Sequence, residues 1–145
     1  RGYNHELGRS PLALFASPEL AARARDGFPA SLEGLPLLIP GEKSATHDRL
    51  LEWYRQQGIH PHLVGQFDDS TLMKSFGKAG MGIFPAPLAM ADEIGRLYGV
   101  ERIATLTEVT LSYYLVSAGR HLSHPGVQAV MAGAQQRLAA LAGNK

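Results

Sequence analysis

The stretch that decides the fold is residues 31–87, which read SLEGLPLLIPGEKSATHDRLLEWYRQQGIHPHLVGQFDDSTLMKSFGKAGMGIFPAP. Short runs at 37–39, 62–65 and 82–84 alternate with longer segments of helical spacing, and glycine or proline punctuates the links. Short apolar runs between turn residues are typical of buried strands. Strand followed by helix with short links predicts a mostly parallel sheet covered by helices, which is an α/β fold.

The predicted helices carry start and stop signals. The first spans 46–57; a hydroxyl side chain at Ser44 or Thr46 can cap its start, and Gly58 ends it. Asp68 or Asp69 begins the second helix, and Gly80 ends it. A third helix is expected over 88–97 and a strand near 100–103.

The segments outside this block extend the same pattern. Residues 12–16 are an apolar run that predicts a buried strand, and Ser17 with Pro18 then begins a short helix. Residues 108–117 are rich in β-branched and aromatic side chains, which favour a long strand. From Ser123 an apolar stripe at helical spacing predicts a last helix packed on a sheet.

The bulk composition excludes several classes of function. The 145 residues are 45% hydrophobic and 19% charged, with a net charge of +1, so no strong field attracts nucleic acid. The absence of cysteine excludes disulfides, thiolate catalysis and cysteine-bound zinc, and it fits a cytoplasmic protein. No apolar stretch could span a bilayer, and no signal peptide opens the sequence. We expect the chain, which starts at Arg1, to be cut from a longer one.

A search for catalytic, cofactor and metal motifs favours a non-enzyme. The sequence has no G-x-S-x-G elbow, no P-loop and no H-E-x-x-H. Gly80-Met81-Gly82 is a lone G-x-G that we interpret as a turn. His60 and His62 could offer two imidazoles to a metal, but no third ligand is evident, and surface histidines are the preferred interpretation. We expect no catalytic residues, no cofactor and no metal.

The loops after the predicted strands are the candidate binding site. Ligands of open parallel sheets bind beyond the carboxyl ends of the strands, and the ends here are 40–44, 67–70 and 84–87. Helix N-termini beside such loops favour polar or anionic groups. The candidate residues are Pro40, Gly41, Ser44, Thr46, Phe67, Asp68, Asp69, Ser70, Phe84 and Pro85.

The pair Asp68-Asp69 allows two interpretations. Both carboxylates are short acceptors placed to cap a helix before Thr71, which favours a structural role. Alternatively, one carboxylate caps while the other faces a ligand or cation. We rank Ser44, Phe67 and Asp68 highest as contacts, since they offer a hydroxyl, an apolar ring and a negative charge.

Nearly the whole chain resembles the distal half of the effector region of LysR-type transcriptional regulators, and within that family the activators of sodium/proton antiporter genes. The residues that carry the resemblance are Pro36–Pro40, Trp53, Phe67-Asp68-Asp69, Leu72-Met73-Lys74, Phe76-Gly77, Phe84–Pro87 and His124-Pro125-Gly126-Val127. The resemblance implies a fold like that of type 2 periplasmic binding proteins, with an effector between two α/β subdomains that two strands connect.

Three parts of the chain follow from this resemblance. Residues 1–17 would be the end of the first subdomain with the first crossover strand, and 18–106 the complete second subdomain. Residues 107–145 would be the second crossover strand and a helix that returns to the first subdomain. The family's N-terminal DNA-binding domain and most of the first subdomain are missing from this sequence, so DNA would be bound only through the missing domain.

The resemblance also implies partners. The effector would be a small molecule or ion; sodium or lithium status is the candidate signal, although no oxygen-rich cation loop is present. The family pairs its effector regions as homo-oligomers, with the helix at 46–57 in the interface and Trp53 as the expected anchor. No membrane partner is expected. The alternatives are a solute-binding protein of the same fold and a small α/β enzyme fragment; a helix-turn-helix upstream would decide for the regulator.

Overall fold

The computed structural model describes residues 3–117, 133 and 136. The expected helix from Ser123 lies outside the described residues, apart from those two positions. The strands are β1 (Tyr3–Ala16), β2 (Pro36–Pro40), β3 (His62–Phe67), β4 (Phe84–Pro87) and β5 (Glu101–Ser117). The helices are α1 (Pro18–Arg25), α2 (Ala45–Gln56), α3 (Ser70–Lys78) and α4 (Ala91–Tyr98), with 3₁₀ turns η1 (Ala30–Leu32) and η2 (Leu88–Met90).

The strands form a mixed arrangement in which β1 opposes its neighbours. One sheet has the order β4-β1-β5, and β1 pairs antiparallel with both partners. A second sheet pairs β2 with β3 in parallel, and a parallel bridge from Leu37 to Ile83 joins the two sheets. The parallel pairing expected for residues 31–87 is confirmed, and the antiparallel pairs come from β1, which precedes that block.

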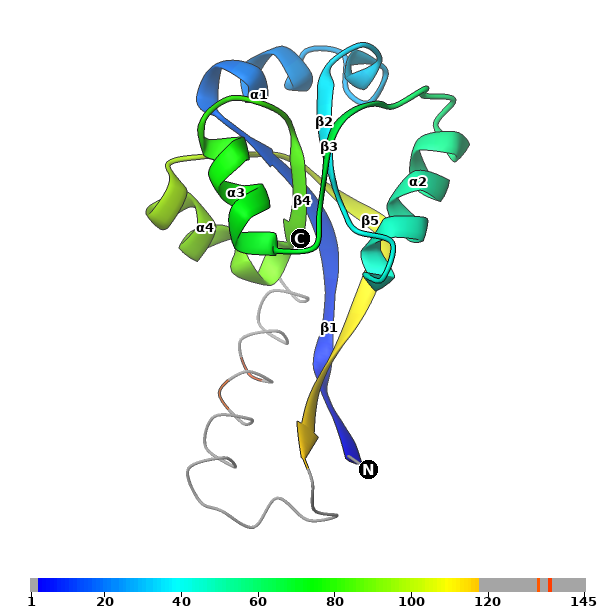
Figure 1. Ribbon diagram of the computed structural model, residues 1–145, viewed down its shortest axis with the longest axis vertical. Coiled ribbons are helices and arrows are strands. Elements are labelled where there is room, and N and C mark those ends of the chain that lie inside the picture. Colours follow the sequence, from blue (N-terminus) through cyan, green and yellow to red (C-terminus); the bar gives the residue numbers. More distant parts are fainter. Residues whose placement is uncertain (1–2, 118–132, 134–135, 137–145) are drawn as a thin grey trace.

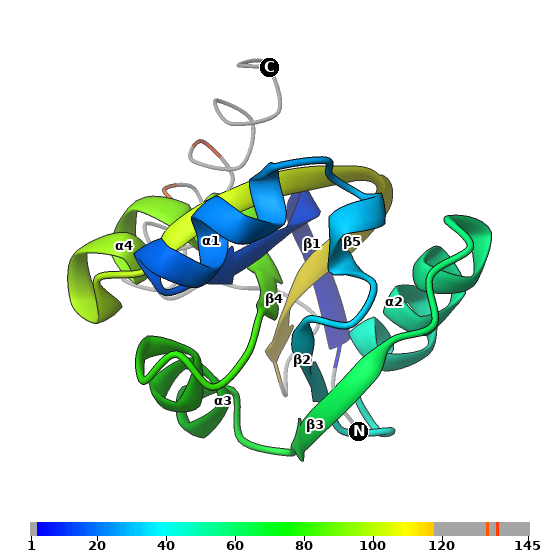
Figure 2. The same ribbon diagram turned by 90° about the horizontal axis from the view of Figure 1, so that it is seen from above.

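Helices cover both faces of the strands, as an α/β fold requires. Leu12, Leu14 and Ala16 of β1 join the apolar cluster beneath α1 and α2. Ala13 and Phe15 point to the other face and join the cluster that holds Met73 of α3 and Ile94 of α4. Successive side chains on a strand alternate faces, so burial on both faces makes β1 a central strand. Figure 1 and, from above, Figure 2 accordingly show α3 and α2 on opposite sides of the strands.

Two strand predictions need correction. The strands expected at 100–103 and 108–117 are one continuous strand, β5, whose register against β1 jumps from Leu106 to Thr110. The strand expected at 82–84 is instead β4, which continues through Pro85 and Pro87. In an antiparallel pair, only every second residue of a strand hydrogen-bonds to a given neighbour. Pro85 and Pro87 are two positions apart, so both can occupy positions that donate no N–H to β1.

The strand pair β1 and β5 projects beyond the helical layers as a two-stranded ribbon (Figure 1). Residues 12–16 lie opposite 101–106, and the projecting part pairs Tyr3–Pro11 with Thr110–Ser117. The sequence predicts strands at 12–16 and 108–117. They do belong to neighbouring strands, but each lies opposite a different part of its partner.

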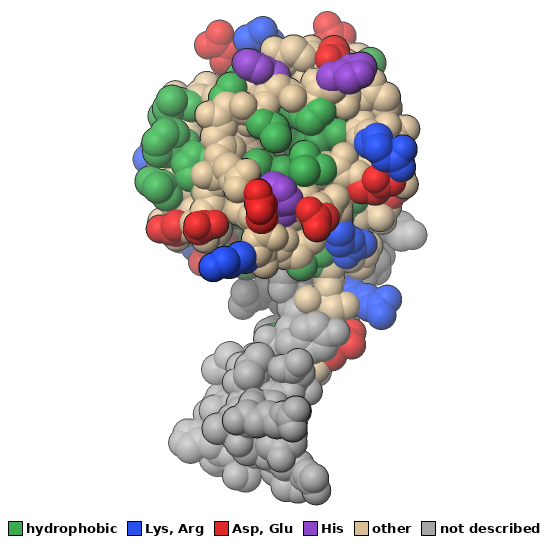
Figure 3. All heavy atoms as spheres, turned by 45° about the vertical axis from the view of Figure 1, so that its right-hand side comes forward, with side chains coloured by type: hydrophobic (Ala, Val, Ile, Leu, Met, Phe, Trp, Pro, Cys, Tyr) green, Lys and Arg blue, Asp and Glu red, His purple; other side chains and the backbone are tan. Residues whose placement is uncertain are grey.

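Trp53 does not fill the role expected of it. Its side chain is only 3% exposed, and its ring stacks on Phe28 with 6.1 Å between centroids. Trp53 is therefore part of the chain's own core and not an exposed anchor for a partner subunit. Two of the exposed large hydrophobic residues, Leu63 and Val64, lie on the edge strand β3, where they are 41% and 47% exposed. Figure 3 shows hydrophobic side chains at the surface on this side of the molecule, with charged residues around them.

Candidate functional site

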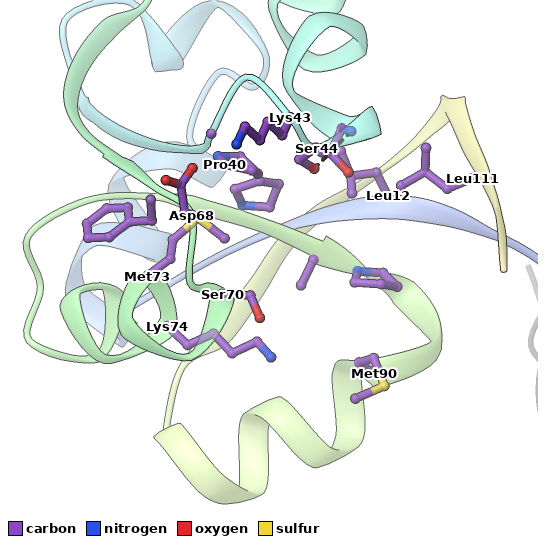
Figure 4. A pocket seen from close by; sticks show the side chains of 16 residues that line it. Leu12, Pro40, Lys43, Ser44, Asp68, Ser70, Met73, Lys74, Met90 and Leu111 are labelled. Carbon is purple, nitrogen blue, oxygen red and sulfur yellow. Dashed lines mark hydrogen bonds between the residues drawn. The ribbon is translucent and has the colours of Figure 1, made fainter. Parts of the chain in front are cut away.

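A cleft of about 700 Å³ lies where β2, β3 and β4 end (Figure 4). Its walls come from the loop between β2 and α2, the turn between β3 and α3, and the strand β4. The lining residues are Leu12, Pro40, Gly41, Lys43, Ser44, Thr46, Phe67, Asp68, Ser70, Met73, Lys74, Pro85, Ala86, Pro87, Met90 and Leu111. The three loops chosen from the sequence therefore meet at one cleft.

Backbone and side-chain hydrogen bonds fix the loop between β2 and α2. The Gly41 N–H donates to the Phe67 carbonyl over 2.7 Å, which ties this loop to the end of β3. The Ser44 hydroxyl accepts from the Thr46 N–H at 3.2 Å and caps α2. Beneath the loop, Nδ1 of the buried His47 lies 2.8 Å from the Pro40 carbonyl, so Nδ1 carries the proton and donates. The loop is thus a fixed wall of the cleft.

The two aspartates divide their roles. Asp69 is the N-cap of α3, and its carboxylate accepts from the Thr71 N–H at 2.9 Å. Asp68 lines the cleft and is exposed, and no hydrogen bond or ion pair engages its carboxylate within the described residues. A Cβ on Gly41 would lie 2.0 Å from Asp68 Oδ1, so the absence of a side chain at Gly41 makes room for this carboxylate.

Eight of the ten candidate residues line the cleft and two do not. Asp69 is occupied by capping α3. Phe84 is fully buried and stacks on Phe15 with 5.8 Å between ring centroids, so it belongs to the core. Strand alternation explains Phe84: it points into the helical layer of α3 and α4.

Several lining residues were missed by the sequence reasoning. Lys43, Ala86 and Pro87 lay inside the predicted loops but were not singled out. Met73 and Lys74 come from the first turns of α3, where helical geometry turns them toward the cleft. Leu12 and Leu111 come from β1 and β5, and the pairing of β1 with both β4 and β5 brings these distant segments to the cleft.

The lining offers binding chemistry without a catalytic arrangement. It contains hydroxyls at Ser44, Thr46 and Ser70, but the described lining includes no histidine that could serve as their base. The described residues include no group of three His, Asp or Glu side chains that could hold a metal ion. None of the helices described is long and apolar enough to cross a membrane.

The chain belongs to the family of LysR substrate-binding domains, whose model matches residues 3–139. It is a fragment of the effector domain of a LysR-type regulator, with the fold of periplasmic binding proteins. It is 39% identical over 103 residues to the transcriptional activator protein NhaR of Escherichia coli (strain K12). It is also 31% identical over 129 residues to the HTH-type transcriptional activator AmpR of Enterobacter cloacae. These stretches are 71% and 84% of this chain but 34% and 41% of the relatives, so the chain spans well under half of either.

Solved structures share the fold. The effector domain of AmpR from Pseudomonas aeruginosa superposes with a TM-score of 0.70 at 23% identity, over 98% of this chain and 67% of that one. The CcmR regulatory domain of Synechocystis PCC6803, solved in complex with 2-PG, gives a TM-score of 0.64 at 14% identity, over 97% and 67%. These relatives are transcriptional regulators and not enzymes, in agreement with the interpretation of the sequence.

Proposed function

We propose that the cleft binds the effector of a LysR-type transcriptional activator, and that occupancy is passed to DNA-binding domains elsewhere in the parent protein. The observation that carries this is the convergence of three strand ends on one cleft whose Asp68, Lys43 and Lys74 side chains have no partner among the described residues. The complex of the CcmR regulatory domain with 2-PG supports a small-molecule effector for this fold.

The proposed mechanism is a population shift. Residues 18–106 would be the second effector subdomain, and the flanking segments 1–17 and 107–145 would lead to the first. The ribbon of β1 and β5 is the connection, and an effector that contacts both subdomains would favour one angle between them. The parent would be a cytoplasmic homo-oligomer that performs no chemistry on its effector, and sodium status is the signal suggested by the resemblance.

Ser70→Trp tests the proposal in the full-length regulator. Ser70 is exposed and lines the cleft, so an indole there fills the cleft without disturbing the core. We expect loss of induced transcription, with basal DNA binding and thermal stability retained. The matched control is Ser75→Trp, on the same helix, exposed and outside the cleft lining. Full induction by the Ser70→Trp regulator would refute the proposed site.

A further inference from the structure

We infer that the effector carries an anionic group, a carboxylate or phosphate, on an apolar body, and that Lys43 and Lys74 bind the anionic group. The inference rests on the proposed function, because it concerns what occupies the same cleft. It adds two residues, Lys43 and Lys74, that are absent from the sequence-based site list, and with them a specific charge for the effector.

The two lysines approach the cleft from different elements. Lys43 lies in the loop between β2 and α2, and Lys74 lies in α3 on the other side of the cleft. In Figure 4 the Lys74 side chain runs past Ser70 on one side of the opening. Lys43 lies on the opposite side. A ligand held between the two ammonium groups would therefore contact both walls.

Neither lysine is neutralised by a described residue. Arg25 pairs with Glu101 and Arg55 with Glu52, whereas Lys43 and Lys74 have no ion pair or hydrogen bond within the described part of the chain. Asp68 supplies the one carboxylate in the lining. Two positive charges against one negative charge leave the cleft attractive to an anion, and an ammonium–carboxylate or ammonium–phosphate bond is stronger than a neutral one.

The remaining lining is mostly apolar, which indicates that the anionic group is attached to a hydrocarbon or ring. Leu12, Met73, Pro85, Ala86, Met90 and Leu111 provide this surface. Burial of an apolar body there supplies affinity, while the charged groups fix its orientation. A bare sodium ion fits poorly, because hard cations require several oxygen ligands and two ammonium groups would repel it. In a sodium-responsive parent, sodium would act through another site or indirectly.

Four probes that share one ring test the charge of the effector. Phenyl phosphate, benzoate, benzylamine and benzyl alcohol are titrated by calorimetry into the full-length regulator at constant ionic strength. A separate titration compares sodium chloride with potassium chloride. We expect the two anions to bind more tightly than the amine and the alcohol. Tighter binding of benzylamine, equal binding of all four probes, or no binding of either anion would overturn the inference.

Substitutions locate the anion. Lys43→Met and Lys74→Met should each weaken binding of the anionic probes about tenfold, and Lys74→Arg should restore most of it, because a charge-assisted hydrogen bond is stronger than a neutral one. The matched control is Lys78→Met, an exposed lysine on the same helix outside the cleft lining. Equal losses in Lys78→Met and Lys74→Met would also overturn the inference.

The Ser70→Trp variant separates this inference from the proposed function. Loss of induction in Ser70→Trp together with no preference for anions would refute the anionic effector alone. Full induction in Ser70→Trp would refute the cleft as the effector site, whatever the probes bind.

Discussion

The two ends of the strands, here called the glycine edge and the cleft edge, are built by different means. At the edge where α2, α3 and α4 lead back into strands, Gly58, Gly80 and Gly99 adopt φ angles of +73°, +82° and +66°. At the opposite, cleft edge, side chains of Ser44 and Asp69 cap helices, and the charged groups beside them have no partner among the described residues. The first edge depends on backbone conformation, whereas the second depends on side-chain chemistry. Substitutions at the glycine edge should therefore change stability alone, whereas substitutions of the lining residues at the cleft edge should change the effector response.

The largest effect on stability is expected from Phe84→Ala. Phe84 lies just inside the cleft edge, but its ring is fully buried against Phe15. Its removal should lower the free energy of unfolding by about 3–5 kcal/mol. Phe67→Ala, at a partly exposed position in the lining, should cost less than half as much and should reduce the response to effector. Denaturant unfolding measures the stability of both variants, and induction assays measure their response to effector. Equal stability losses would contradict the distinction between Phe84 as a core residue and Phe67 as a lining residue.

At the glycine edge, Gly99→Ala tests the backbone requirement. A Cβ at Gly99 would meet no atom within 4 Å, so any cost comes from its left-handed φ and not from crowding. We expect a loss of roughly 1–2 kcal/mol, from the penalty for non-glycine residues in this region. The effector concentration at half-maximal induction should be unchanged. A shift in that midpoint at full stability would show that this edge also communicates with the cleft.

The cap at the cleft edge should have an intermediate effect. Asp69→Ala removes the acceptor for the Thr71 N–H, and we expect a loss of about 1 kcal/mol. Asp69→Asn should restore most of that stability, because asparagine caps nearly as well. Thermal unfolding of the two variants measures the difference. If alanine and asparagine behave alike, the capping bond contributes nothing.

The smallest effect on stability is expected from Asp68→Asn, beside the cap. Asp68 is exposed and has no bonding partner among the described residues, so the change should lie within about 0.5 kcal/mol of zero. Its effect should instead be on induced transcription, because the variant removes the negative charge in the lining. Normal induction would leave Asp68 without a functional role. A stability loss as large as that of Asp69→Ala would reverse the roles assigned to the two aspartates.

The sequence predicted most elements because their signals are local. The run at 37–39 and the stop at Gly58 each depend on neighbours within a few residues, and the structure confirms them; of the two candidate caps, Ser44 and Thr46, it is Ser44 that caps α2. The choice between Asp68 and Asp69 as the cap could not be made, since both precede Thr71 and only backbone geometry decides. The continuity of β5 was missed because the register jump after Leu106 depends on its partner β1.

The cleft could be predicted only in part for the same reason. Loops at the carboxyl ends of parallel strands follow from topology, so Pro40, Ser44 and Asp68 were accessible to sequence reasoning. Lys74 lies inside a helix, and its place in the lining depends on how α3 packs against β4. The place of Leu12 and Leu111 in the lining depends on the pairing of strands that are about a hundred residues apart in the chain, and no local sequence pattern predicts such pairing.

The position of β1 has a consequence for the order in which the chain can fold. As a ribosome delivers the chain, β1 emerges first, yet both of its partners, β4 and β5, follow more than sixty residues later. The nascent strand therefore exposes apolar side chains on both faces and two unpaired edges until β4 and β5 have been synthesised. Closure of such distant contacts is slow, and unpaired apolar strands favour aggregation. The β2–β3 pair and its helices can form earlier, so assembly should end with β1 entering between β4 and β5.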